Sequence, residues 1–204
     1  SPDEGRPRVF GGQVAAQSLV AAIRTVEGRV VHSLHSYFLR PGDPKIPIIY
    51  EVDRIRDGRT FNTRRVVAVQ NGEAIFNMAA SFQVEEEGFE HHVAMPDVPP
   101  PESVPSNEER LAEARANEDH PIFRWLSKLD RPILIHDLDP IDPVRPTVRT
   151  GAHRVWFRSD GALPDDPVIH RCVLTYASDM TLLGASLAQR GLRTRDLRAK
   201  GDWA

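Results

Sequence analysis

Two turn dipeptides placed between alternating runs constrain the fold of this chain more than any other feature. Asp57-Gly58 and Asn71-Gly72 both favour the left-handed turns that join antiparallel strands. Around them, apolar and polar residues alternate in four runs: 30–39, 46–52, 61–69 and 74–84. The sequence therefore predicts a four-stranded antiparallel meander.

A helix is predicted ahead of these strands. From Gln13 onward, apolar side chains recur at helical spacing, at Ala16, Leu19, Val20, Ile23 and Val26. Gly28 suits the position after the helix, because glycine adopts the left-handed backbone of a C-cap. Residues 1–86 are thus expected to form one α+β unit, a helix followed by a sheet.

Residues 87–150 are expected to form a proline-rich linker, since prolines cluster near both of its ends. Ser106 and Glu109 have the spacing of a capping box and predict the start of a helix. Three short elements are expected in the linker: a helix over 107–117, an apolar docking cluster at 122–126 and a strand at 133–135.

The pattern of the first unit restarts at residue 151. A strand is expected over 153–158 and a single helix over 167–187. A second meander needs on the order of 50 residues at ordinary strand lengths. The charged stretch 191–204 is too short for that, so residues 151–204 are expected to form a second unit that is incomplete.

Asp179 is the leading candidate for a functional residue. It lies within the predicted helix, three residues after Tyr176 and four before Leu183, on the same apolar stripe. A carboxylate in such a place must be paired, hydrogen-bonded or protonated, because an unpaired buried charge is too costly. From position alone, a structural ion pair and a catalytic role remain open.

Composition excludes several classes of protein. The net charge of -3 gives no general attraction to nucleic acid. The sequence has no apolar run near the ~20 residues of a membrane span and no secretory signal at its start. The single Cys172 has no internal disulfide partner and is expected to act as a small core residue, which favours a reducing compartment, the cytoplasm.

Six stretches carry a resemblance to a known family: RVFGGQ at 8–13, VHSLHSYFLRPGD at 31–43, RRVVAVQNG at 64–72, ASFQ at 80–83, GFEH at 88–91 and YASD at 176–179. In these stretches the chain resembles the type II acyl-CoA thioesterases, over residues 8–187. The resemblance implies a double hot-dog fold, in which a helix wrapped by an antiparallel sheet occurs twice. It also implies hydrolysis of fatty acyl-CoA to free fatty acid and CoA, without a metal or organic cofactor.

The resemblance further implies a catalytic role for Asp179. In the family, the matching Asp works with a Thr or Ser and a Gln from the second sheet to activate the attacking water. Those two partners match no residue of this chain. The backbone N–H groups at Gly11-Gly12-Gln13 are a candidate oxyanion site, because a helix start attracts negative charge, but close packing there is the alternative.

Other residue types are weaker candidates. Arg40, Arg64 and Arg65 suit the phosphates of CoA or, equally, structural ion pairs. Phe38, Phe76, Met78 and Tyr176 fit an acyl tunnel or an ordinary core. Thr175 and Ser178 lack the elbow motif of a nucleophilic serine and are expected to bond to the backbone. His32, His35, His91 and His92 lack metal-ligand spacing and are expected to be structural.

Two alternatives to a thioesterase remain. A hot-dog acyl-thioester hydratase keeps the fold but pairs its carboxylate with a His, and no His accompanies Asp179 at helical spacing. The other alternative is a non-catalytic acyl-CoA-binding or scaffold protein. In either case an incomplete second sheet leaves strand edges open, so a homo-oligomer is expected.

Overall fold

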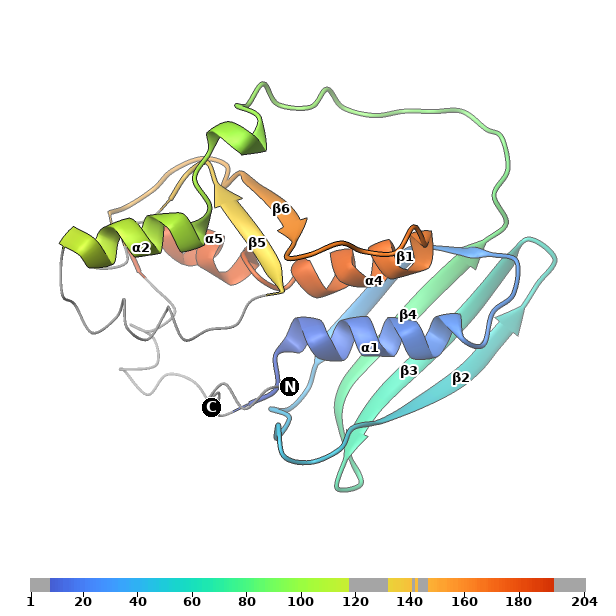
Figure 1. The fold of residues 1–204 in the computed structure, drawn as a ribbon. Coiled ribbons are helices and arrows are strands. Elements are labelled where there is room, and N and C mark those ends of the chain that lie inside the picture. The colour runs from blue at the N-terminus through green and yellow to red at the C-terminus, as the bar shows by residue number, and fades with distance from the viewer. Residues whose placement is uncertain (1–7, 118–131, 141, 143–146, 193–204) are drawn as a thin grey trace. The chain divides into compact units, whose positions relative to one another are not determined.

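The computed structural model describes residues 8–117, 132–140, 142 and 147–192. These residues group into two compact units (Figure 1). The first unit combines residues up to 93 with residues 163–178, and the second combines residues 94–162 with residues from 179 onward. No helix within the described parts of the chain has the length and apolar character to cross a membrane.

In the first unit, helix α1 (Gly11–Ile23) lies across a four-stranded antiparallel sheet (Figure 1). The strands are β1 (Val30–Phe38), β2 (Ile49–Asp57), β3 (Phe61–Gln70) and β4 (Glu73–Gln83). A helix packed on one face of an antiparallel sheet is the arrangement that the hot-dog prediction requires. The four predicted strands are confirmed.

The predicted meander is wrong in one respect, because the strand order is β1-β4-β3-β2. The two turn dipeptides do form the hairpins β2–β3 and β3–β4. Asn71 and Gly72 both have positive φ, 51° and 79°, as a two-residue hairpin turn requires. Strand β1 instead pairs with β4, and residues 39–48 carry the chain across to β2 at the other edge.

The core lies between α1 and the inner face of the sheet. Alternation along the strands places every second side chain on that face. The buried side chains from the sheet include Val66, Ala68, Phe76, Met78, Ala80 and Phe82, and those from α1 include Val14, Ala15, Leu19 and Ala22. Phe76 and Met78 are thus ordinary core residues, whereas Phe38 on edge strand β1 is 55% exposed.

Helix α1 ends one turn earlier than its apolar stripe predicts. Its last helical residue is Ile23, and both the amide and the hydroxyl of Thr25 donate to the Ala22 carbonyl oxygen, at 3.0 and 2.8 Å. These short-range bonds close the helix before Val26. Gly28 has a φ of 63°, but it lies in the turn beyond the helix rather than at the C-cap.

Helix α4 (Pro167–Ala177) packs alongside α1 within the first unit (Figure 1). Asp166 caps its start by accepting a hydrogen bond from the Val168 amide at 2.8 Å. Cys172 is 6% exposed and belongs to the same core as α1, as expected for a small apolar side chain. Burial, and to a lesser degree the carboxylate of Asp166, raise the pKa of the Cys172 thiol. The contacts of α4 therefore do not follow a division at residue 150.

The described residues of the second unit form a short 3-10 turn, two helices and a two-stranded sheet: η1 (Pro101–Ser103), α2 (Asn107–Asn117), β5 (Ile133–Asp137), β6 (Val155–Ser159) and α5 (Leu182–Ala188). Strand β5, within the expected linker, pairs antiparallel with β6. The capping box of α2 is confirmed. The Ser106 amide donates to Glu109 Oε2 at 2.7 Å, and the Glu109 amide donates to Ser106 Oγ at 3.1 Å. The expected docking cluster at 122–126 lies outside the described residues.

Candidate active site

Asp179 lies in a turn between α4 and α5 and not on a helix. The prediction of a single helix over 167–187 is therefore wrong, because residues 178–181 separate two helices. The side chain of Asp179 is half-buried. A carboxylate at a helix break is positioned by the turn rather than by a helical stripe, and its neighbours do not follow helical spacing.

Hydroxyl side chains bond to the backbone near the end of α4. Thr175 Oγ1 donates to the Arg171 carbonyl at 2.9 Å, and Ser178 Oγ donates to the Thr175 carbonyl at 2.8 Å. Serine and aspartate compete in this way with the helical backbone and favour helix ends. The expectation that Thr175 and Ser178 bond to the backbone is confirmed.

The start of α1 packs tightly against the end of α4 within the first unit. The Phe10 and Tyr176 rings meet edge to face, with centroids 4.9 Å apart. Gly12 is buried, and a Cβ at this position would overlap the carbonyl oxygen of Tyr176 and the ring of Phe10. Close packing therefore accounts for a glycine at position 12.

We expect Gly12→Ala to lower the free energy of unfolding by about 1–3 kcal/mol, because the added methyl group must displace a backbone oxygen. Urea denaturation of the purified chain measures this loss. Gly184→Ala in α5 is the control, since a Cβ there meets nothing within 4 Å and alanine favours a helix. An equal effect of the two substitutions would contradict the packing argument.

Of the three candidate arginines, Arg64 cannot contact CoA phosphates. Its side chain is 1% exposed, lies on the inner face of the sheet and pairs with Asp57. Arg65 points to the opposite face and lies 3.6 Å from Asp53, with both side chains more than half exposed. Arg40 lies 3.3 Å from Glu73 and donates to the Ala74 carbonyl at 2.8 Å. The structural alternative thus holds for Arg64, and the other two arginines lie in surface ion pairs.

The four candidate histidines are all exposed. His32 hydrogen-bonds to Ser81 Oγ at 2.8 Å, and the His35 ring packs against Tyr37. His91 and His92 lie exposed in a segment without regular structure. Among the residues that the structure describes, no group of three His, Cys, Asp or Glu side chains is arranged to hold a metal ion.

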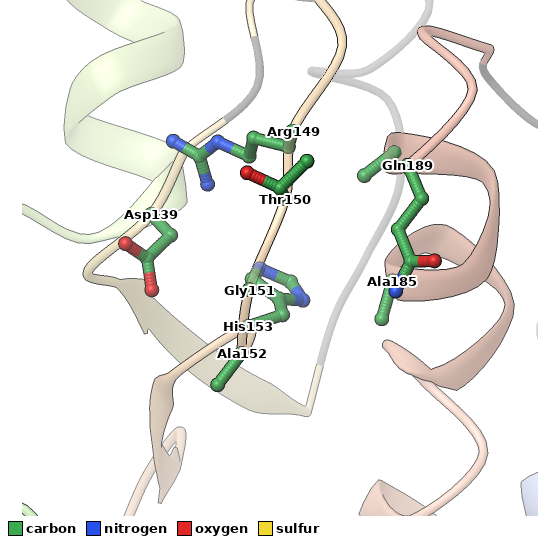
Figure 2. A pocket seen from close by; sticks show the side chains of 9 residues that line it. Asp139, Arg149, Thr150, Gly151, Ala152, His153, Ala185 and Gln189 are labelled. Atoms are coloured by element: carbon green, nitrogen blue, oxygen red, sulfur yellow. The ribbon is translucent and has the colours of Figure 1, made fainter.

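A cavity of about 100 Å³ lies in the second unit, and Figure 2 shows the side chains around it. His153 lines it and places its Nε2 3.0 Å from Asp137 Oδ2. Asp139 also lines it and is held by the guanidinium of Arg154 at 3.0–3.1 Å, which lowers the pKa of the Asp139 carboxyl. Both carboxylates therefore already have a side-chain partner, His153 for Asp137 and Arg154 for Asp139. Asp179 is not among the lining residues.

A larger groove, of about 410 Å³, lies in the first unit. Val9, Gln13 and Gln17 line it from the start of α1, and residues 44–48 with Tyr50 line it from the side of β2. Sequence reasoning did not find this groove, because its two walls lie about thirty residues apart in the chain. One feature of the sequence does point to the groove: Gln13 and Gln17 lie four apart on a helix whose other residues, apart from Ser18, are glycine or apolar.

Comparison with known proteins points to one family. A family model described as "Acyl-CoA thioesterase N-terminal domain" matches residues 2–83, and a second, described as "Acyl-CoA thioesterase", matches residues 143–201. Asp179 lies inside the second match. "Acyl-CoA thioesterase 2" of Haemophilus influenzae is 39% identical over 180 residues, which are 88% of this chain and 63% of that protein.

Solved structures agree with the sequence comparisons. The acyl-CoA thioesterase II TesB2 of Mycobacterium marinum is 41% identical, with a TM-score of 0.70 over 93% of this chain and 66% of that chain. A hot-dog protein of Alicyclobacillus acidocaldarius, 23% identical, shares the fold with a TM-score of 0.64, over 90% of this chain and 63% of that chain. The predicted hot-dog fold is confirmed. The chain spans between 59% and 63% of the length of its bacterial and mammalian relatives.

Proposed function

The chain belongs to the acyl-CoA thioesterase family, and on that premise we propose that it hydrolyses fatty acyl-CoA thioesters to free fatty acid and CoA. One observation carries the proposal beyond the family name. Asp179 is a half-buried carboxylate at the break between α4 and α5, within the residues that the second thioesterase model matches. In the proposed function this carboxylate is the base that assists attack by water on the thioester.

In the proposed reaction, Asp179 orients a water molecule and takes one of its protons. The water oxygen attacks the thioester carbonyl carbon and forms a tetrahedral intermediate. The carbon–sulfur bond then breaks, the fatty acid leaves with the water oxygen, and the proton goes to the CoA sulfur or to solvent. Neither a metal nor an organic cofactor takes part in these steps.

A hydratase is less well supported than a hydrolase, because the relatives above are named thioesterases. A binding or scaffold role predicts that the chain holds acyl-CoA without cleaving it. The test is release of free CoA from palmitoyl-CoA by the purified chain, followed with a thiol reagent. Binding of palmitoyl-CoA without any release would overturn the enzymatic proposal and favour a binding protein.

Association with a second copy of the chain is also proposed. Strand β1 is an edge of the described sheet, and its Tyr37 and Phe38 side chains are 59% and 55% exposed. An open edge with exposed apolar side chains favours pairing with another chain. We expect light scattering to give at least twice the mass of one chain, and a monomer mass would contradict this.

The proposed compartment is reducing. Cys172 is the single cysteine of the chain and is buried as a free thiol in the core of the first unit. A chain that uses cysteine only as a core residue fits the cytoplasm better than an oxidising compartment.

A further inference from the structure

The groove between α1 and the approach to β2, here named the α1–β2 groove, has two kinds of wall. Val9, Ile46 and Ile48 give it apolar surface, whereas Gln17 and Lys45 bring polar groups to the same space. Its volume of about 410 Å³ is within the range of small-molecule sites. Its lining suits a ligand that carries both apolar and hydrogen-bonding groups.

Tyr50 fixes the polar side of the groove. Its hydroxyl donates to Gln17 Oε1 at 2.5 Å. Burial raises the pKa of the Tyr50 hydroxyl to about 12, so it stays protonated and keeps donating at physiological pH. Because the Gln17 oxygen accepts this bond, the amide NH₂ group of Gln17 is the part that remains to donate to a ligand.

Hydrogen bonds to the buried Gln70 hold the opposite wall in place. Gln70 Nε2 donates to the carbonyls of Asp43 and Ile46 at 2.9 and 2.6 Å, and the Asp43 amide donates to Gln70 Oε1 at 2.9 Å. Gln70 itself is 6% exposed on the inner face of β3. The loop that presents Lys45 is therefore anchored to the sheet, and the groove is largely formed before a ligand arrives.

We propose that the α1–β2 groove binds the pantetheine arm of CoA, with the Gln17 amide hydrogen-bonded to an amide of the arm and Lys45 paired with a phosphate. The proposal rests on the function above, which makes acyl-CoA the ligand. The pantetheine arm is a chain of two amides joined by methylene groups and ending in a phosphate. Its chemistry matches the groove group by group: amide to amide, methylene to isoleucine and phosphate to ammonium.

A fatty acyl tail fits this groove less well. A hydrocarbon chain offers no acceptor to the Gln17 NH₂ group and no anion to Lys45. Covering these polar groups with a hydrocarbon would remove their water without replacing its hydrogen bonds, which is unfavourable. The groove therefore selects the polar arm of the substrate and not its tail.

Titration calorimetry on the intact chain tests the proposal with three probes: CoA, 4′-phosphopantetheine and pantetheine. Gln17→Ala removes the amide at an exposed helix position, and we expect it to weaken binding of all three probes about fivefold. Lys45→Glu is expected to weaken CoA and 4′-phosphopantetheine about tenfold and to leave pantetheine unchanged, because pantetheine carries no phosphate.

Arg54→Glu is the matched control, since it reverses a charge on the exposed surface of β2 away from the groove. Wild-type Kd values for CoA in both groove variants, or no CoA binding by the wild-type chain, would overturn the groove proposal. If the groove variants change probe binding as expected but the chain does not hydrolyse palmitoyl-CoA, the enzymatic function is refuted and the groove proposal stands. If the chain hydrolyses palmitoyl-CoA but both groove variants bind the probes as the wild type does, the groove proposal is refuted and the enzymatic function stands.

Discussion

Replacing Arg64 with methionine is expected to lower the free energy of unfolding by about 3 kcal/mol. The Arg64 side chain is 1% exposed and every nitrogen of its guanidinium donates a hydrogen bond. Nε donates to Thr25 Oγ1 at 2.7 Å, and Nη2 donates to the Thr25 carbonyl at 3.0 Å and to the Asp57 carboxylate at 2.5 Å. Nη1 donates to the carbonyls of Arg56 and Thr63, both at 3.0 Å. Methionine fills much of the space but donates to none of these acceptors.

Arg65→Met is the matched control for this prediction. Arg65 is the next residue on the same strand, points to the opposite face, and its side chain is 59% exposed beside a 57% exposed Asp53. An exposed pair contributes roughly 0–1 kcal/mol, so we expect a change within that range in urea denaturation. Asp57→Asn should fall between the two variants, because Arg64 keeps its other acceptors. A loss for Arg64→Met no larger than for Arg65→Met would refute the argument that the buried network stabilises the sheet.

The features that sequence reasoning predicted correctly depend on neighbours in the chain. The hairpin at Asn71-Gly72 requires only that two adjacent residues adopt positive φ, and the capping box from Ser106 to Glu109 spans four residues. Such local structures can be predicted from the sequence because the interacting atoms come from one short stretch of the chain. The same reasoning found all four strands of the first sheet.

The features that sequence reasoning missed depend on distant residues. Once the two hairpins have formed, β2 and β4 are the open edges of the sheet. No short sequence motif predicts that β1 pairs with β4. Alternation along β3 placed Arg64 and Arg65 on opposite faces, but which of the two is buried depends on distant partners such as Thr25. The break after α4 was hidden because an apolar stripe runs through residues 169–183 regardless of the turn.

The candidate site shows the same difference between local sequence signals and contacts of distant residues. Asp179 was singled out by its place in a predicted apolar stripe, and a resemblance carried by a short motif gave it a catalytic role, although its expected place on a helix was wrong. The α1–β2 groove was missed because Gln17 and Tyr50 meet only after the sheet has formed. A residue type at a motif can be read from sequence, whereas a cavity is a property of packed elements.

Replacing Asp179 with asparagine is expected to reduce kcat for palmitoyl-CoA hydrolysis by about 100- to 1,000-fold. Asparagine has nearly the shape of aspartate and still forms hydrogen bonds, but its amide cannot accept the proton of the attacking water. Because that proton moves only in the transition state, we expect kcat and kcat/KM to fall together while KM stays near its wild-type value. Steady-state release of free CoA measures all three quantities.

Asp165→Asn provides the control for this substitution, since Asp165 is an exposed carboxylate on the approach to α4. It removes the same charge and should leave kcat unchanged. Urea denaturation of both variants separates loss of chemistry from loss of fold, because a structural Asp179 would lower stability and activity in parallel. If Asp179→Asn hydrolyses palmitoyl-CoA at the wild-type rate, or loses activity only as far as it unfolds, Asp179 is not the base and the proposed role must move to another group.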